Sequence, residues 1–149
     1  MHVPIEPARS APPARPGFAL FALGFRPFYL AAGVLAALSV PLWAARFAGW
    51  LGEWVYYSES VWHAHEMLFG YAFAVMVGFL FTAVRNWTGR PTPTGAKLAG
   101  IVALWLAARV LVFTPWTELA AVADTAFALA AAAGIAGPLF AVGARRNYF

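Results

Sequence analysis

Long stretches of this 149-residue chain carry no charged side chain, and they constrain the fold more than any other feature. Residues 28–45 and 67–84 each contain 18 uncharged residues, which extend about 27 Å as an α-helix at about 1.5 Å per residue. A helix needs about 20 apolar residues to cross a bilayer. Only 11% of the residues are charged, compared with about a quarter of a typical soluble domain. The sequence therefore predicts a membrane protein.

The chain is predicted to be all-α, a polytopic transmembrane helical bundle with four membrane-spanning segments. Arg109 interrupts the third segment, and Asp124 lies near the start of the fourth. Residues 1–17 are rich in Pro, Ala and Arg and lack a helical apolar period, so we expect a disordered tail there and a transmembrane domain in residues 18–149. The four expected spans are residues 27–45, 61–84, 98–113 and 119–142.

The positive charges in the short loops predict the orientation, because Lys and Arg are enriched on the cytoplasmic side of membrane proteins. The remaining loops contain glutamates and only one arginine, Arg46. Both termini are therefore expected in the cytoplasm. The formal net charge of +4 reflects these topology signals, and we predict no nucleic-acid partner. The basic residues concerned are Arg9, Arg15, Arg26, Arg85, Arg90, Lys97, Arg145 and Arg146.

Every strongly polar side chain of the expected spans lies on the same, outer side of the membrane. His63, His65 and Glu66 begin the second span, Arg109 lies in the outer half of the third, and Asp124 begins the fourth. An arginine inside a span costs at least ~2.5 kcal/mol on insertion scales, so Arg109 should face the bundle, a water-filled cavity or an anionic partner. The candidate partners are Asp124, Glu66 and a bound anionic group. A structural ion pair between Arg109 and Asp124 is as good an interpretation as a functional site.

The absence of cysteine excludes thiolate metal sites, so a metal would be held by His, Met, carboxylate or backbone oxygen. Neutral imidazole binds haem iron or copper, which makes His63 and His65 candidate metal ligands. Glu66 is a candidate to bond a ligand's other ring nitrogen, to carry a proton, or simply to favour the first turn of a helix. Histidines at an interface also often bond only water or headgroups. The seven tryptophans are expected to be mostly interfacial anchors.

Helical geometry separates the two histidines. At about 100° per residue, Glu66 lies about 60° from His63, whereas His65 lies about 200° from His63 on the face of Phe69. The His63 and Glu66 face continues as a row of small residues, Gly70, Ala74 and Gly78, which lets another helix approach closely, so we expect this face to point into the bundle. Either the histidines serve two sites, or the helix begins after His65 and an extended segment 62–65 places both on one side.

Four motifs follow one another along the chain: GFRPFYL at 24–30, WHAHEMLFGYAFAVMVGFLFTAV at 62–84, NWTGRPTPTG at 86–95 and LWLAARV at 104–110. Together they resemble the NnrS family of bacterial membrane proteins, over almost the whole chain after the tail. The resemblance implies a multi-pass protein of the bacterial inner membrane that contains haem and copper. It also implies an association with denitrification, nitric oxide and tolerance of nitrosative stress.

Carried over by position, the WHAHE motif places the metal-binding histidines at His63 and His65 with Glu66 beside them, and the LWLAAR motif places an intramembrane arginine at Arg109. Arg85 departs from the proline expected before NWTG. Family members have more spans, so the resemblance implies that this chain corresponds to their N-terminal third. The expected partners are then the lipid bilayer and the missing C-terminal spans or other membrane chains.

Two alternatives remain open. In the first, the chain is a transporter or proton-conducting segment without metal, in which Glu66, Arg109 and Asp124 line a polar path. In the second, it only packs against other membrane chains or is a non-functional truncated fragment. The sequence contains no Ser/His/Asp arrangement, no phosphate-binding glycine loop and no paired carboxylates at a useful spacing, so it assigns no enzymatic reaction.

Overall fold

The computed structural model describes residues 19–52 and 57–143, and all regular elements in these ranges are helices. The all-α prediction is therefore confirmed there. The predicted disordered tail lies outside the described residues, as do Arg145, Arg146 and one of the loop glutamates, Glu53. The elements are η1 (Ala19–Ala22), α1 (Phe25–Phe47), α2 (Glu59–His65), η2 (Glu66–Ala72), α3 (Phe73–Thr88), α4 (Gly95–Leu111) and α5 (Thr117–Ala141).

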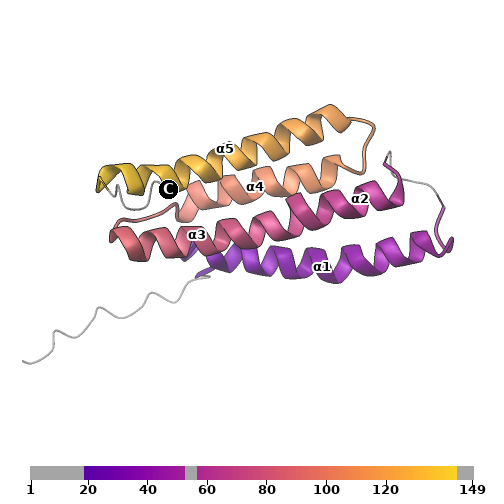
Figure 1. Cartoon of the computed structure of the whole chain (residues 1–149), viewed down its shortest axis with the longest axis horizontal. Coiled ribbons are helices and arrows are strands. Elements are labelled where there is room, and N and C mark those ends of the chain that lie inside the picture. The colour runs from indigo at the N-terminus through magenta and orange to yellow at the C-terminus, as the bar shows by residue number, and fades with distance from the viewer. Residues whose placement is uncertain (1–18, 53–56, 144–149) are drawn as a thin grey trace, which may run out of the picture.

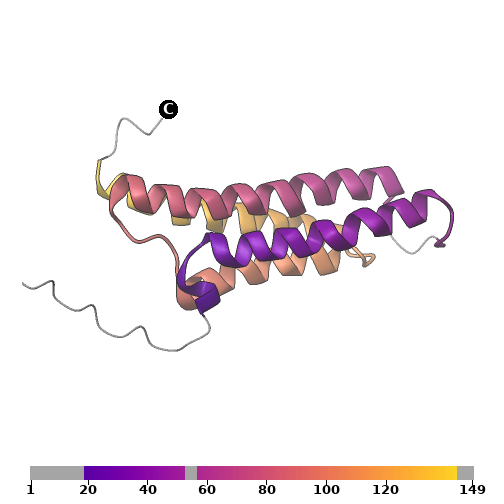
Figure 2. The ribbon, with the colours of Figure 1, turned by 90° about the horizontal axis from the view of Figure 1, so that it is seen from below.

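The helices form a bundle of four long rods that lie side by side (Figures 1 and 2). The second rod consists of α2, the π-helix η2 and α3 without a break, and rods that follow one another in the chain run in opposite directions. The α1–α2 and α4–α5 connections lie at one end of the bundle, and the α3–α4 connection lies at the other. Helices α2 and α5 begin, and α4 ends, at the end of the bundle that holds the α1–α2 and α4–α5 connections.

Three helices in the described residues are long and apolar enough to cross a membrane: Phe25–Phe47, Glu59–Thr88 and Thr117–Ala141. The fourth rod, α4, has 17 residues and extends about 26 Å. It ends at Leu111, two residues earlier than predicted. The prediction of four spans thus holds for three helices, whereas the orientation of the termini stays a prediction.

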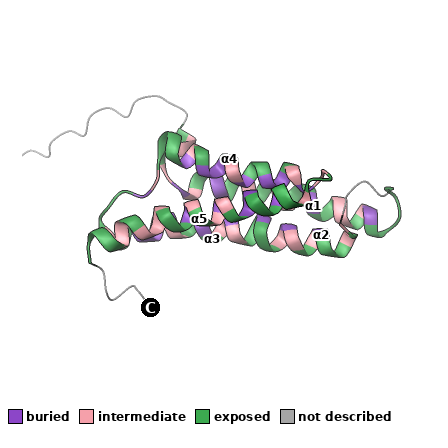
Figure 3. Cartoon of the chain, turned by 90° about the horizontal axis from the view of Figure 1, so that it is seen from above, coloured by how far each residue is buried: buried purple, intermediate pink, exposed green. Residues whose placement is uncertain are grey.

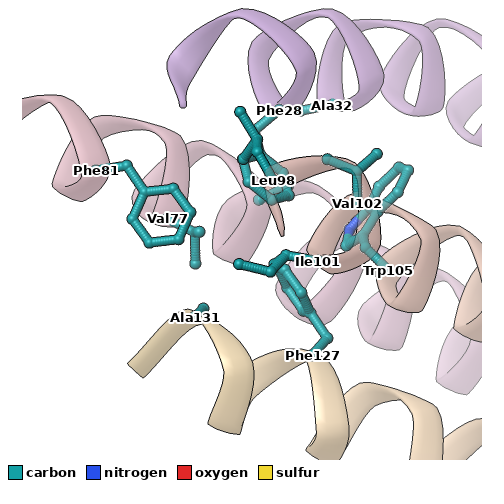
Figure 4. Packing of buried hydrophobic residues seen from close by; sticks show 11 residues of the cluster. Phe28, Ala32, Val77, Phe81, Leu98, Ile101, Val102, Trp105, Phe127 and Ala131 are labelled. Atoms are coloured by element: carbon teal, nitrogen blue, oxygen red, sulfur yellow. The ribbon is translucent and has the colours of Figure 1, made fainter. Parts of the chain in front are cut away.

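The buried core lies between all four rods and is largely aromatic and aliphatic (Figure 4). The ring of Phe28 from α1 lies 6.1 Å from that of Phe81 in α3 and 5.7 Å from that of Phe127 in α5, measured between centroids. Many large apolar residues on the outside of the bundle are exposed instead, and Figure 3 marks exposed residues in green along all the helices. This exterior is suited to lipid, since a soluble monomer seldom exposes so much contiguous apolar surface.

The row of small residues predicted on the second rod lies in the interior. Gly70, Ala74 and Gly78 are all buried. At Gly78, an added Cβ would lie 3.0 Å from the Cβ of Phe28 and 3.2 Å from the ring of Tyr29, both in α1. The small residues therefore bring α1 close to α3, as the sequence predicted.

Candidate functional site

Arg109 lies inside the bundle and is paired with two carboxylates from other rods. Its Nη2 donates to both oxygens of Asp124, at 2.7 and 2.9 Å. Its Nε lies 3.1 Å from Glu66 Oε2, a contact between charges whose angle is too poor for a hydrogen bond. Arg109 is 6% exposed, Asp124 is 9% exposed and Glu66 is 1% exposed. Two of the three partners predicted for Arg109 are thus in contact with it.

His65 completes this arrangement, which we call the polar cluster (His65, Glu66, Arg109 and Asp124). Its Nδ1 lies 3.1 Å from Glu66 Oε1, and its Nε2 lies 3.2 Å from Asp124 Oδ2. An ionised carboxylate only accepts hydrogen bonds, and a neutral imidazole has a single N–H, so both contacts are satisfied only by the doubly protonated ring. The polar cluster brings two basic and two acidic side chains together, the kind of pairing that buried charged groups require.

His63 lies elsewhere, against α1. Its ring stacks on that of Trp43, with 4.3 Å between centroids and 18° between planes. Its Nδ1 is buried and has no hydrogen-bond partner among the described residues. His63 therefore faces α1, whereas Glu66 faces Arg109 of α4, and the histidine that contacts Glu66 is His65.

The π-helix η2 explains why His65, and not His63, lies beside Glu66. Backbone bonds in η2 run from residue i to i+5, so its turn holds about one residue more than an α-turn. The segment before it is therefore rotated by about 100° relative to a continuous α-helix. His65 then occupies the direction that Glu66 would have had, and it faces Asp124 of α5.

The two histidines lie at two separate places, which agrees with the regular helix that α2 forms through both of them. The described parts of the chain contain no group of three or more His, Cys, Asp or Glu that could hold a metal ion. A metal ligand must present the lone pair of a neutral nitrogen. His63 Nδ1 fits this requirement, whereas both nitrogens of His65 face carboxylates and one carboxylate would have to move away first.

An ion pair outside the polar cluster occurs at the same end of the bundle. Arg46, near the end of α1, lies 3.3 Å from Glu59 at the start of α2, and Arg46 is 5% exposed. Arg46 is the only arginine in the loops that are predicted to lie outside the cytoplasm. Its charge is partly neutralised there by Glu59.

The sequence prediction missed Trp105 as part of this region. Its indole Nε1 donates to the carbonyl oxygen of Gly70 at 2.9 Å, and Trp105 is only 2% exposed, so it is not an interfacial anchor. The guanidinium carbon of Arg109 lies 5.6 Å from the centroid of its ring. The i, i+4 spacing of Trp105 and Arg109 places both on one face of α4 and was the available signal.

An apolar helical bundle with a buried cluster of paired charges defines a polytopic membrane protein with an intramembrane polar site. The family model described as NnrS protein matches residues 19–149. The chain therefore belongs to the NnrS family. No curated protein and no solved structure matches the chain significantly.

Proposed function

We propose that this chain is an NnrS-type protein of the bacterial inner membrane that acts in the response to nitric oxide and nitrosative stress, in connection with denitrification, and that it holds haem or copper. Membership of the family over residues 19–149 is the observation that carries the proposal. The family is generally associated with haem and copper. The apolar exterior of the bundle supports a location in the bilayer.

Within this proposal His63 is the stronger candidate ligand. Its unpartnered Nδ1 leaves a nitrogen with which His63 would hold a haem iron. His65 is the candidate for a separate site that forms only when Glu66 or Asp124 releases its ring. A bound haem or copper centre would supply the site that takes up nitric oxide. Arg109, Glu66 and Asp124 keep the neighbouring helices in register and balance the charge around His65.

Metal content measured on the purified protein tests the ligands. The chain is purified in detergent, and its visible absorption spectrum and copper content are recorded for the unaltered protein, His63→Ala and His65→Ala. His63→Ala is expected to lose haem absorbance, and His65→Ala to lose copper. His2→Ala is the matched control, because it removes the third histidine of the chain outside the described bundle.

A longer family member with the same WHAHE motif is measured in parallel, since further spans can contribute ligands. Unchanged haem and copper in both variants of both proteins would show that neither histidine is a ligand. Haem or copper in the longer protein alone would show that the site needs the additional spans.

The polar cluster also favours a second function, proton conduction through the bundle. Ionisable side chains inside membrane segments commonly mark ion or proton pathways. In liposomes, metal-free protein would then produce a proton leak that Glu66→Gln abolishes. Glu118→Gln is the control, because Glu118 is exposed in the first turn of α5. Liposomes without any leak would exclude this function.

A further inference from the structure

The π-helix η2 is the irregular part of the longest rod, and its wide turn begins in the polar cluster. π-helices account for well under 1% of residues in soluble proteins, and π-turns occur frequently at functional sites. η2 starts at Glu66 and continues to Ala72. The contacts that hold this turn therefore bear directly on the direction of Glu66 and of the preceding residue, His65.

Trp105 of α4 bonds to the backbone of η2. Its indole N–H donates to the carbonyl oxygen of Gly70 at 2.9 Å, and both residues are buried. One turn further along α4, the Arg109 guanidinium lies within cation–π range of the same indole ring. Trp105 thus contacts both the π-helix that contains Glu66 and the arginine that pairs with Glu66.

Gly70 provides the space for this arrangement. A Cβ at Gly70 would lie 2.5 Å from Leu35 Cδ2, 3.1 Å from Glu66 Oε2 and 3.3 Å from Arg109 Nη1. The first distance is far below van der Waals contact, so a larger residue must displace Leu35 or the η2 backbone. The other two show that the Glu66 and Arg109 side chains pass directly over the glycine.

We propose that Trp105 and Gly70 are positioning residues of the polar cluster, which hold the π-turn and so direct His65 and Glu66 toward Arg109 and Asp124. This proposal rests on the proposed function in one respect, because it takes the polar cluster as the candidate site. It concerns the rotation of α2 about its axis and requires no bound metal.

Loss of the π-turn has a defined geometric consequence. A continuous α-helix would rotate α2 by about 100° relative to α3, which is one residue position. His65 would then lie on the face of Phe69 and Met76, which are 47% and 49% exposed. Its contact with Asp124 would be lost.

The absence of cysteine from the chain allows this rotation to be measured. Single cysteines replace Trp62, His63 and Ala64 in the detergent-solubilised 149-residue protein, and their rates of reaction with a maleimide are compared. Residue 62 is buried, 63 is half-buried and 64 is exposed. In the Trp105→Phe and Gly70→Ala backgrounds, the protected position is expected to shift by one residue, from 62 to 63. Labelling therefore rises at residue 62 and falls at residue 63.

Two matched substitutions serve as controls. Trp87→Phe changes a 58% exposed tryptophan, and Gly100→Ala adds a Cβ that meets nothing within 4 Å. Both should leave the labelling pattern unchanged. An unchanged pattern in Trp105→Phe and Gly70→Ala would overturn the proposal, as would a rise at all three positions, which indicates general loosening. Since no metal enters the measurement, its outcome is independent of whether His63 and His65 bind haem or copper.

Discussion

At the scale of residues, the polar cluster is kept inside an apolar bundle by its balance of charge. Glu66 is 1% exposed and Arg109 is 6% exposed, so water screens neither group well. Desolvation of such groups is expensive, and removing one member of a buried pair typically costs about 3–5 kcal/mol because its partner keeps an uncompensated charge. Each residue of the polar cluster therefore depends on the others.

Asp124→Leu is expected to lower the free energy of unfolding by about 3–5 kcal/mol, since Arg109 and His65 then face Glu66 alone. Arg109→Met should be similarly costly. The double variant leaves the neutral pair of His65 and Glu66, so its loss should be smaller than the sum of the two single losses by about 0.5–3 kcal/mol. Unfolding of all three variants in detergent measures this difference.

Glu118→Ala is the control for these variants, because it removes an exposed carboxylate from the same helix. It should change the free energy of unfolding by less than about 0.5 kcal/mol. Strictly additive losses in the double variant would contradict a coupled polar cluster.

At the scale of elements, two features of the second rod determine how it packs: the small residues of α3 and the π-helix η2. Its α3 part carries small residues that let α1 approach, and its η2 part interrupts the α-helical register. The first device sets how closely the helices pack. The second sets the direction of the histidines that precede it.

Gly78→Leu tests the close packing of α1 on α3. The new side chain would begin 3.0 Å from the Cβ of Phe28, so α1 must move outward. We expect a loss of about 1–3 kcal/mol, the usual cost of overpacking, seen as a lower unfolding midpoint in detergent. Gly100→Leu should have little effect, because its Cβ meets no atom within 4 Å. Equal midpoints for the two variants would refute the close-packing role.

At the scale of the whole molecule, α4 decides the membrane topology. The other three rods are long and apolar enough to cross a bilayer, and α4 runs beside them for most of their length (Figure 1). It is shorter than its neighbours, and its first residues lie short of the end that α3 and α5 reach (Figures 1 and 2). A fourth crossing by α4 stays a prediction, which the loop charges carry.

Labelling of intact cells can test the fourth crossing, again because the chain has no cysteine of its own. With both termini in the cytoplasm, Ser58→Cys and Thr114→Cys should react with a membrane-impermeant maleimide, whereas Arg90→Cys should react only after lysis. The three positions precede α2, follow α4 and precede α4, respectively. Labelling of Ser58→Cys without Thr114→Cys would show that α4 does not cross. Labelling of Arg90→Cys alone would show the reverse orientation.

The sequence by itself determined the class of fold and the residues of the polar layer. Long uncharged runs and sparse charge predict apolar helices by their length alone, and the cost of an intramembrane arginine required partners for Arg109. Both conclusions depend only on the positions of charged and apolar residues along the chain. The small-residue row around Gly78 was also readable, because helical periodicity places its members on one face.

Only the tertiary structure decided which histidine joins the polar cluster. A periodicity of 3.6 residues placed His63 nearer than His65 to the direction of Glu66, but η2 rotates α2 and turns His65 toward Asp124. The contacts that hold η2 come from Trp105, 35 residues away in the chain. A local pattern contains no information about such a distant contact, so the choice between the two imidazoles depends on how the helices pack.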